Sequence, residues 1–142
     1  MSAIYLEHEI TYVEVRPKKT MRLTTSNSTR IIPSVGDSMR AAHQVIAKQQ
    51  DYCFPRYARI GNCNGNSASA ALGKWMKNYC EAGATVHGLR HAFSDRLRAV
   101  NAPVGLIHQL GGWSAKSVGI SYGDGYDLQS VHNRSAQLAT HG

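Results

Sequence analysis

The order of hydrophobic patterns along this chain restricts its fold to a small N-terminal sheet followed by helices. Residues 10–16 are mostly β-branched or aromatic, which favours a strand. Residues 17–20 contain proline and two lysines and predict a turn, after which residues 21–24 and 28–33 predict the returning strand or strands. From residue 34 onward the apolar residues recur at helical spacing. We therefore expect a mainly helical α+β fold, in which an N-terminal β-hairpin precedes about five or six helices.

Six segments have one apolar face and carry capping residues, proline or glycine at their ends. They are residues 34–50, residues 67–79, residues 88–100, a segment that begins at Pro103, residues 115–120 and a segment that follows Asp127. The expected caps are Ser34 or Asp37, then Ser67, Ser114 and Asp127. The residues expected to face the core are Met39, Ala42, Val45, Ile46, Leu72, Trp75, Met76, Tyr79, Leu89, Phe93, Leu97, Val100, Val104, Ile107, Leu110, Leu128, Val131 and Leu138. Residues 51–66 are rich in Gly, Asn and Pro and predict a loop.

Charge and cysteine usage narrow the class of protein. The 142 residues form one domain with a formal net charge of +7, which fits a polyanionic partner. No apolar run approaches the length of a membrane span, and the first residues do not have the pattern of a signal peptide. Cys53, Cys63 and Cys80 are odd in number and lack C-x-x-C spacing. We therefore expect free thiols, a reducing cytoplasmic location and no membrane association.

Four residues in the second half of the chain suit phosphate chemistry. His87 and Arg90 are three positions apart, so a helix that begins here places both on one face near its unpaired amides. Arg90 can bind two phosphate oxygens, and His87 can exchange a proton near neutral pH. Trp113 offers an indole N–H donor and follows a Leu-Gly-Gly step, in which Gly111-Gly112 breaks the chain and lets Trp113 approach closely. Tyr122 lies nine positions later and is the candidate nucleophile.

Each of these residues also has a plainer interpretation. His87 is otherwise a helix cap or a core histidine, and Tyr122 a buried tyrosine with Tyr126 as the alternative nucleophile. His91 is either a further site residue or a support for Arg90. His87 and His91 have the spacing of a metal pair on a helix, but no nearby cysteine or acidic cluster completes a site, so we expect no metal.

The combination of His87-x-x-Arg90, Leu-Gly-Gly-Trp113 and Tyr122 resembles the tyrosine recombinase family, also called phage integrases. The resemblance spans about residues 5–137 and is strongest from residue 86 onward. It implies the fold of the DNA breaking-rejoining enzymes. It also implies site-specific recombination or integration of double-stranded DNA, as in mobile elements, without metal or other cofactor. Tyr122 would form a 3′-phosphotyrosyl link, while Arg90 and Trp113 stabilise negative charge and His87 assists proton transfer.

The basic N-terminal hairpin is either an ordinary hairpin with solvated charges or a surface laid along a DNA backbone. The resemblance favours the second interpretation, with DNA contacts from Lys18, Lys19, Arg22 and Arg30. Family members commonly carry a catalytic lysine here in a Leu-Lys-Thr run, whereas this chain has Leu23-Thr24-Thr25. Thr24 therefore holds the place of the lysine, and a hydroxyl cannot replace an ammonium as general acid. Lys18 or Lys19 remains open as a substitute.

The residues before this hairpin contain no Gly-Leu-Arg-like run, which in the family supplies a further catalytic arginine. We therefore expect residues 1–142 to be a partial catalytic domain of a longer integrase, without the upstream arginine helix and the N-terminal DNA-clamping domain. The isolated chain would then be inactive or weak as an enzyme. Two alternatives are a non-catalytic DNA-binding remnant and a structural or interaction domain of the same fold. The last helix either folds back on its own domain or docks on a second copy in a homo-oligomer.

Overall fold

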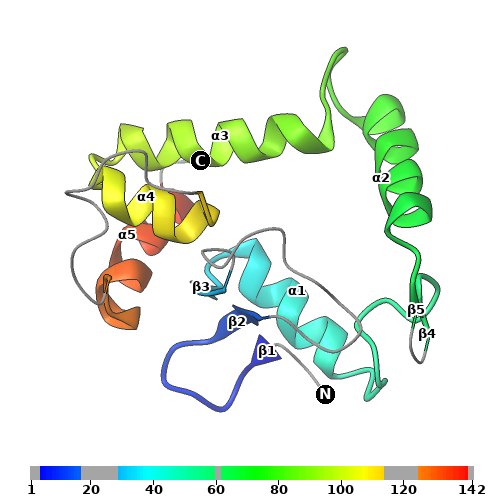
Figure 1. The fold of residues 1–142 in the computed structure, drawn as a ribbon, viewed down its shortest axis with the longest axis horizontal. Helices are drawn as coiled ribbons and strands as arrows, with labels where there is room; N and C mark the ends of the chain where they lie inside the picture. The colour runs from blue at the N-terminus through cyan, green and yellow to red at the C-terminus, as the bar shows by residue number, and fades with distance from the viewer. Residues whose placement is uncertain (1–3, 17–28, 60–61, 114–124, 141–142) are drawn as a thin grey trace.

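The computed structural model describes residues 4–16, 29–59, 62–113 and 125–140, and these form an α+β fold (Figure 1). The expected fold class is confirmed: a small antiparallel sheet precedes helices that follow one another along the chain. The strands are β1 (Ile4–Tyr5), β2 (Tyr12–Val15), β3 (Arg30–Pro33), β4 (Ala58–Arg59) and β5 (Asn62–Cys63). The helices are α1 (Asp37–Ile46), α2 (Gly65–Tyr79), α3 (Val86–Ala99), α4 (Val104–Gly111) and α5 (Leu128–Thr140).

The N-terminal sheet has the order β1-β2-β3, with both pairs antiparallel. The predicted pairing of strands β2 and β3 is present, with Val13 opposite Ile32. Strand β1 is an addition that the sequence pattern did not predict. It is fixed to β2 by side chains, because the rings of Tyr5 and Tyr12 stack with centroids 4.7 Å apart. The Tyr5 hydroxyl also donates to Glu14 Oε2 at 2.8 Å, which raises the pKa of Tyr5.

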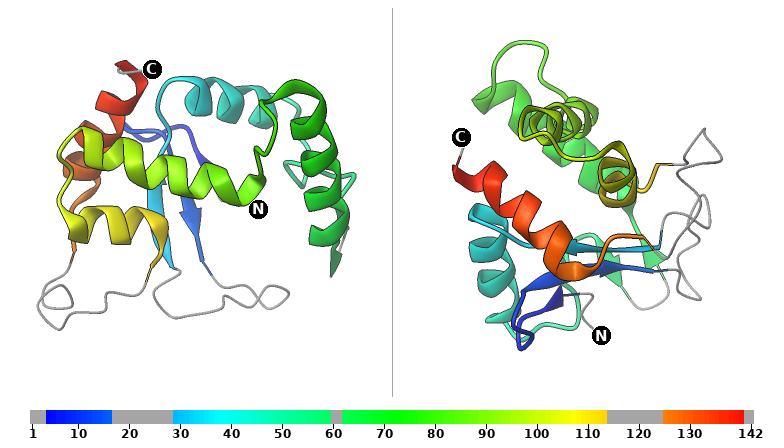
Figure 2. Two further views of the ribbon diagram at one scale, coloured as in Figure 1. Left: turned by 90° about the horizontal axis from the view of Figure 1, so that it is seen from above. Right: turned by 90° about the vertical axis from the view of Figure 1, so that its left-hand side faces the viewer.

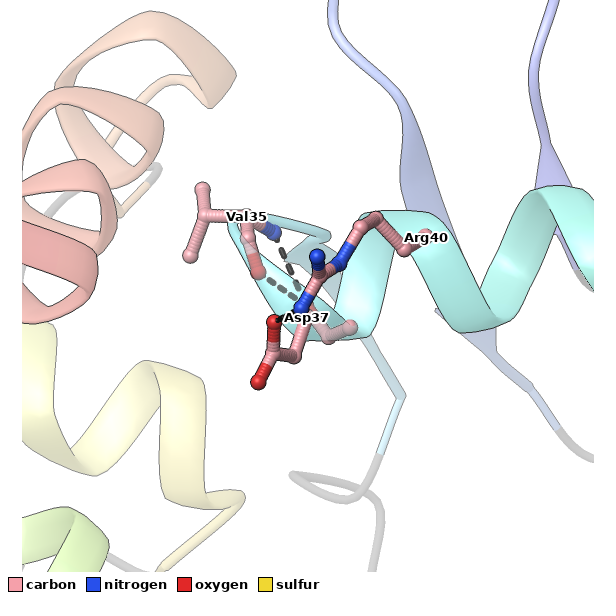
Figure 3. A network of polar contacts seen from close by, with 4 residues as sticks. Val35, Asp37 and Arg40 are labelled. Atoms are coloured by element: carbon pink, nitrogen blue, oxygen red, sulfur yellow. Dashed lines mark hydrogen bonds and ion pairs between the residues drawn. The ribbon is translucent and has the colours of Figure 1, made fainter.

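Helix α1 begins without either of the two predicted caps. Gly36 occupies the cap position with φ 54°, and no side chain caps the helix there. A Cβ on Gly36 would lie 3.1 Å from the Ala139 Cβ, so glycine allows α1 to begin close to α5. The turn before the helix is held by Ser38, whose Oγ accepts from Val35 N at 2.9 Å and donates to Val35 O at 2.7 Å. Figure 3 shows this turn beside the ion pair of Asp37 and Arg40.

Other helix ends also differ from the sequence expectation. Asn64 caps α2, because its side chain accepts from the Ser67 amide at 3.0 Å, so Ser67 lies inside the helix. Thr85 caps α3 in the same way through Gly88, and the helix therefore begins earlier than predicted. Asp127 accepts from the Ser130 amide at 2.9 Å, as predicted for the start of α5. Hydrogen bonds from Ser130 lower the pKa of Asp127. The short strands β4 and β5 pair within the predicted loop, and the predicted helix 115–120 with its cap Ser114 lies outside the described residues.

The core lies among α3, α4 and α5, which contact one another or β3, and Figure 2 shows α3 and α4 side by side. Leu97 of α3 is completely buried, at 0% exposure. Ile32 of β3, Phe93 and Trp113 pack against the core from its border. The buried members of this cluster are Leu97, Val100, Ala102, Leu106, Ile107, Leu110, Val131 and Leu138. The sheet and the helices therefore share one core through β3.

Several predicted core residues are exposed. Leu89 and Val104 point to solvent, and Leu106 is buried on α4 where Val104 was expected. On α2, Met76 is buried at 4% exposure, whereas Leu72, Trp75 and Tyr79 are exposed, with Trp75 at 55%. The prediction of Trp75 as a core residue was therefore wrong. The physical reason is position: α2 contacts α3 and stands away from the core of α4 and α5 (Figure 1).

Cys53, Cys63 and Cys80 are free thiols, as expected. Within the residues that the structure describes, no helix is both long and apolar enough to cross a membrane.

Replacement of Leu97 by alanine should strongly destabilise the fold. The side chain is completely buried, so Leu97→Ala removes packed methyl groups and is expected to cost about 2–5 kcal/mol. Leu89→Ala makes the same chemical change on the same helix at a side chain that is 60% exposed, and should change stability by roughly 0.5 kcal/mol or less. Urea unfolding followed by circular dichroism measures both. Equal losses would contradict the position of the core.

Candidate active site

The N-terminal part of α3 presents His87 and Arg90 on one face, as their spacing predicted. The Thr85 cap fixes the start of this helix through the Gly88 amide. Both His87 and Arg90 are exposed. The ring of His91 meets that of His87 edge-on, with centroids 4.8 Å apart. The His91 ring therefore contacts His87, the candidate proton-transfer residue, directly.

The side chain of Arg90 joins α3 to the C-terminal end of α4. Its Nη2 donates to the carbonyl oxygen of Gly111 at 2.8 Å. Its Cζ lies 4.5 Å from the centroid of the Trp113 ring, which is the geometry of a cation–π contact. The structure therefore brings together two of the candidate residues, Arg90 and Trp113, that the sequence places on separate segments.

The Gly111-Gly112 step makes this contact possible. Gly112 follows α4 in the left-handed region, with φ 64° and ψ 34°, and the Trp113 amide donates back to His108 O at 3.0 Å. A Cβ on Gly111 would overlap the Trp113 ring. Two glycines are therefore required for the indole to fold back over the end of α4, as the sequence predicted.

Arg30 reaches the same place from β3. Its Nε donates to Leu110 O at 3.0 Å, one carbonyl before the acceptor that Arg90 uses. The pKa of Arg30 is lowered, first by burial and then by the positive charge of Arg90. A Cβ on Gly112 would lie 2.6 Å from Arg30 Nη1, so the guanidinium packs directly on this glycine. Sequence reasoning placed Arg30 on the hairpin and did not associate it with Arg90, because strand and helix are far apart in the chain.

The remaining candidates lie outside the described residues. They are Lys18, Lys19, Arg22, Thr24 and Tyr122. Tyr126 lies beside α4, where the Gln109 side chain makes two hydrogen bonds of 2.8 Å with its backbone. Tyr126 is therefore anchored to α4, the short helix that Trp113 follows.

The described cluster is suited to an anion. Arg30 and Arg90 are cationic, and Trp113 can only donate through its indole nitrogen. In the described part of the chain, no three side chains of His, Cys, Asp or Glu gather in a way that could hold a metal ion. The chemistry available here is recognition of an oxyanion by guanidinium and indole N–H groups.

Replacement of Gly112 by alanine should destabilise the junction of β3, α3 and α4. The new Cβ would require a positive φ and would meet the Arg30 guanidinium, so a loss of about 1–3 kcal/mol is expected. Gly73→Ala is the matched control, because Gly73 lies inside α2 with nothing within 4 Å of the added Cβ. It should stabilise by about 0.5–1 kcal/mol. Urea unfolding of both variants tests this, and a neutral Gly112→Ala would disprove the close approach.

Comparison with known proteins agrees with the motif. Residues 1–127 match the profile of the Phage integrase family. No match was found among curated proteins or among solved structures. The matched region contains β3, α3 and α4, the elements that supply Arg30, Arg90 and Trp113. Because the match covers most of its length, the chain belongs to the phage integrase family, the tyrosine recombinases of DNA recombination and integration.

Proposed function

We propose that this chain is part of the catalytic domain of a tyrosine recombinase, and that Arg90 and Trp113 bind the DNA phosphate at which a strand is cut. The observation that carries the proposal is the contact between these two side chains at the end of α4. The backbone carbonyl of Gly111 and the Trp113 ring hold the guanidinium in a fixed place. Donors that are fixed before the reaction stabilise developing charge without further rearrangement.

The reaction we propose has two displacements. The Tyr122 oxygen attacks phosphorus, its proton passes to a base, and the bond from phosphorus to the 5′-oxygen breaks. The products are a 3′-phosphotyrosyl link and a strand with a free 5′-hydroxyl, after that oxygen takes up a proton. A 5′-hydroxyl then attacks the phosphotyrosyl link, restores the phosphodiester and releases Tyr122. Dividing one difficult displacement into two is the general advantage of covalent catalysis.

The other candidates take supporting roles in this proposal. His87 exchanges the proton, and its exposed position on the first turn of α3 is compatible with access to DNA. Lys18, Lys19 and Arg22 contact the phosphate backbone of DNA in this proposal. The formal charge of +7 supports an approach to DNA. Association with a second copy of the chain is a further part of the proposal, as the resemblance implies, although Val131 and Leu138 of α5 pack in the core of their own domain.

A non-catalytic DNA-binding remnant is the second candidate. One observation favours it: Leu23-Thr24-Thr25 stands where the family commonly carries Leu-Lys-Thr. Without an ammonium in this register, the 5′-oxygen lacks an obvious proton donor. Such a remnant would bind DNA and form no covalent link.

The catalytic proposal is tested with an oligonucleotide that carries a 5′-bridging phosphorothiolate. Its thiolate leaves without protonation, so the absence of the family lysine matters less. We expect a covalent adduct with the wild type and with Tyr126→Phe, and none with Tyr122→Phe. Arg90→Ala should react on the order of 100-fold more slowly, because one preorganised charge donor is lost. Denaturing electrophoresis detects the adduct.

An adduct that persists in Tyr122→Phe would contradict the assignment of the nucleophile. No adduct from the wild type would support the DNA-binding remnant instead.

DNA binding should weaken steeply with salt, because each phosphate contact releases counterions. Replacing Lys18, Lys19 or Arg22 by alanine should reduce the slope of log affinity against log salt by about one per residue. Lys74→Ala, which removes a lysine of α2, is the control. Fluorescence anisotropy between low and high salt measures the slope. A wild-type affinity that does not change with salt would exclude this electrostatic mode of binding.

A further inference from the structure

Two arginines from distant parts of the chain meet at one helix terminus. Arg30 of β3 donates to Leu110 O at 3.0 Å, and Arg90 of α3 donates to Gly111 O at 2.8 Å. The two acceptors are consecutive carbonyls in the last turn of α4. The first of these contacts bridges 80 positions in the sequence and the second 21. The arrangement therefore exists only in the folded chain.

The two positively charged guanidinium groups repel each other in the folded chain. The charge of Arg90 lowers the pKa of Arg30, in addition to the larger effect of burial. The negative end of the α4 dipole and its carbonyl acceptors offset part of the repulsion. A guanidinium carries five N–H donors in one plane, so a bond from Nε to a carbonyl is compatible with further bonds from the same group. An anion that contacts both groups would lower their mutual repulsion.

The neighbouring residues Gly112 and Trp113 restrict the orientations of the two guanidinium groups. Gly112 has no side chain, and Arg30 Nη1 lies 2.6 Å from where its Cβ would be. Trp113 lies against Arg90 with 4.5 Å between Cζ and the ring centroid. Since neither guanidinium can rotate freely, little entropy is lost when an oxyanion binds. Planar forks of this kind match the oxygens of a phosphate.

We propose that Arg30 is a second phosphate-binding arginine, which together with Arg90 binds a single phosphate group of DNA. The inference rests on the proposed function for the identity of that phosphate as the one that is cut. It gives Arg30 a role in the same site, where the sequence suggested a contact elsewhere along the backbone. The competing explanation is that Arg30 serves only to hold β3 against α4.

Arg96 provides a matched control for that explanation. Its Nη2 donates to Leu138 O at 2.8 Å, in the last turn of α5. Arg96→Gln therefore removes the same kind of bond, from an arginine to a helix-terminal carbonyl, six positions after Arg90 on α3 and at the end of α5 instead of α4. A purely structural role of Arg30 would make Arg30→Gln and Arg96→Gln behave alike toward phosphate.

The experiment measures thermal unfolding of the full chain in inorganic phosphate and in chloride at equal ionic strength. At saturating phosphate the melting temperature of the wild type should rise by about 2–5 °C. Arg30→Gln and Arg90→Gln should each lose most of this rise, while Arg96→Gln keeps it. Any rise shared by all four proteins is the general stabilisation that phosphate gives by exclusion from protein surfaces.

A full phosphate effect in Arg30→Gln, or no effect specific to phosphate in the wild type, would overturn the inference. If Arg30→Gln does not unfold cooperatively, its melting temperature cannot be used, and Arg30→Lys is measured in its place. Lysine keeps the charge but lacks the planar fork, so less than half of the wild-type rise is expected. The complete rise in Arg30→Lys would equally overturn the inference.

The phosphate experiment tests the role of Arg30, and the adduct experiment tests the proposed function, so either proposal can be contradicted while the other stands. A phosphate effect that depends on Arg30, in a chain that forms no tyrosyl adduct, would remove the proposed function and leave the phosphate site. An adduct formed by a chain whose Arg30→Gln variant keeps the full phosphate effect would leave the proposed function and remove the role of Arg30.

Discussion

The C-terminal end of α4 is the point on which the described structure depends. Its last carbonyls accept hydrogen bonds from Arg30 of β3 and Arg90 of α3, and the chain then turns through Gly112. Sheet and helices are thus joined by charged hydrogen bonds beside a shared apolar core. These bonds exploit the negative end of a helix dipole. The same bonds hold two guanidinium groups where an anion could reach them, so stability and recognition use one arrangement.

The buried side chains of α4 explain why such a short helix can hold the two arginines in place. Leu106, Ile107 and Leu110 are all buried, and the helix contacts both α3 and β3. A helix of this length is unstable alone and takes its order from packing. Its position is therefore set by the core, and the core in turn sets where Trp113 and the two arginines lie. Helix α2 is the contrast, since it contributes Met76 to the interior and leaves Trp75 and Tyr79 exposed.

Membership of the phage integrase family and the geometry of the cluster rest on different observations. The family follows from the match over residues 1–127. The cluster follows from contacts that no sequence motif contains, above all that of Arg30 with Leu110. Both concern the same part of the chain, since the matched residues include Arg90 and Trp113. A phosphate site is the simplest chemistry that accounts for the cations gathered there.

The sequence by itself determined the local features. β-branched runs predicted β2 and β3, the Gly111-Gly112 step predicted the close approach of Trp113, and Asp127 predicted the start of α5. Each depends on residues close together in the chain, where propensity and spacing are sufficient. Only the tertiary structure decided that Leu89 and Trp75 face solvent and that Arg30 lies beside Arg90. Periodicity shows that a helix has an apolar face, but which neighbours cover that face depends on packing between segments distant in the sequence.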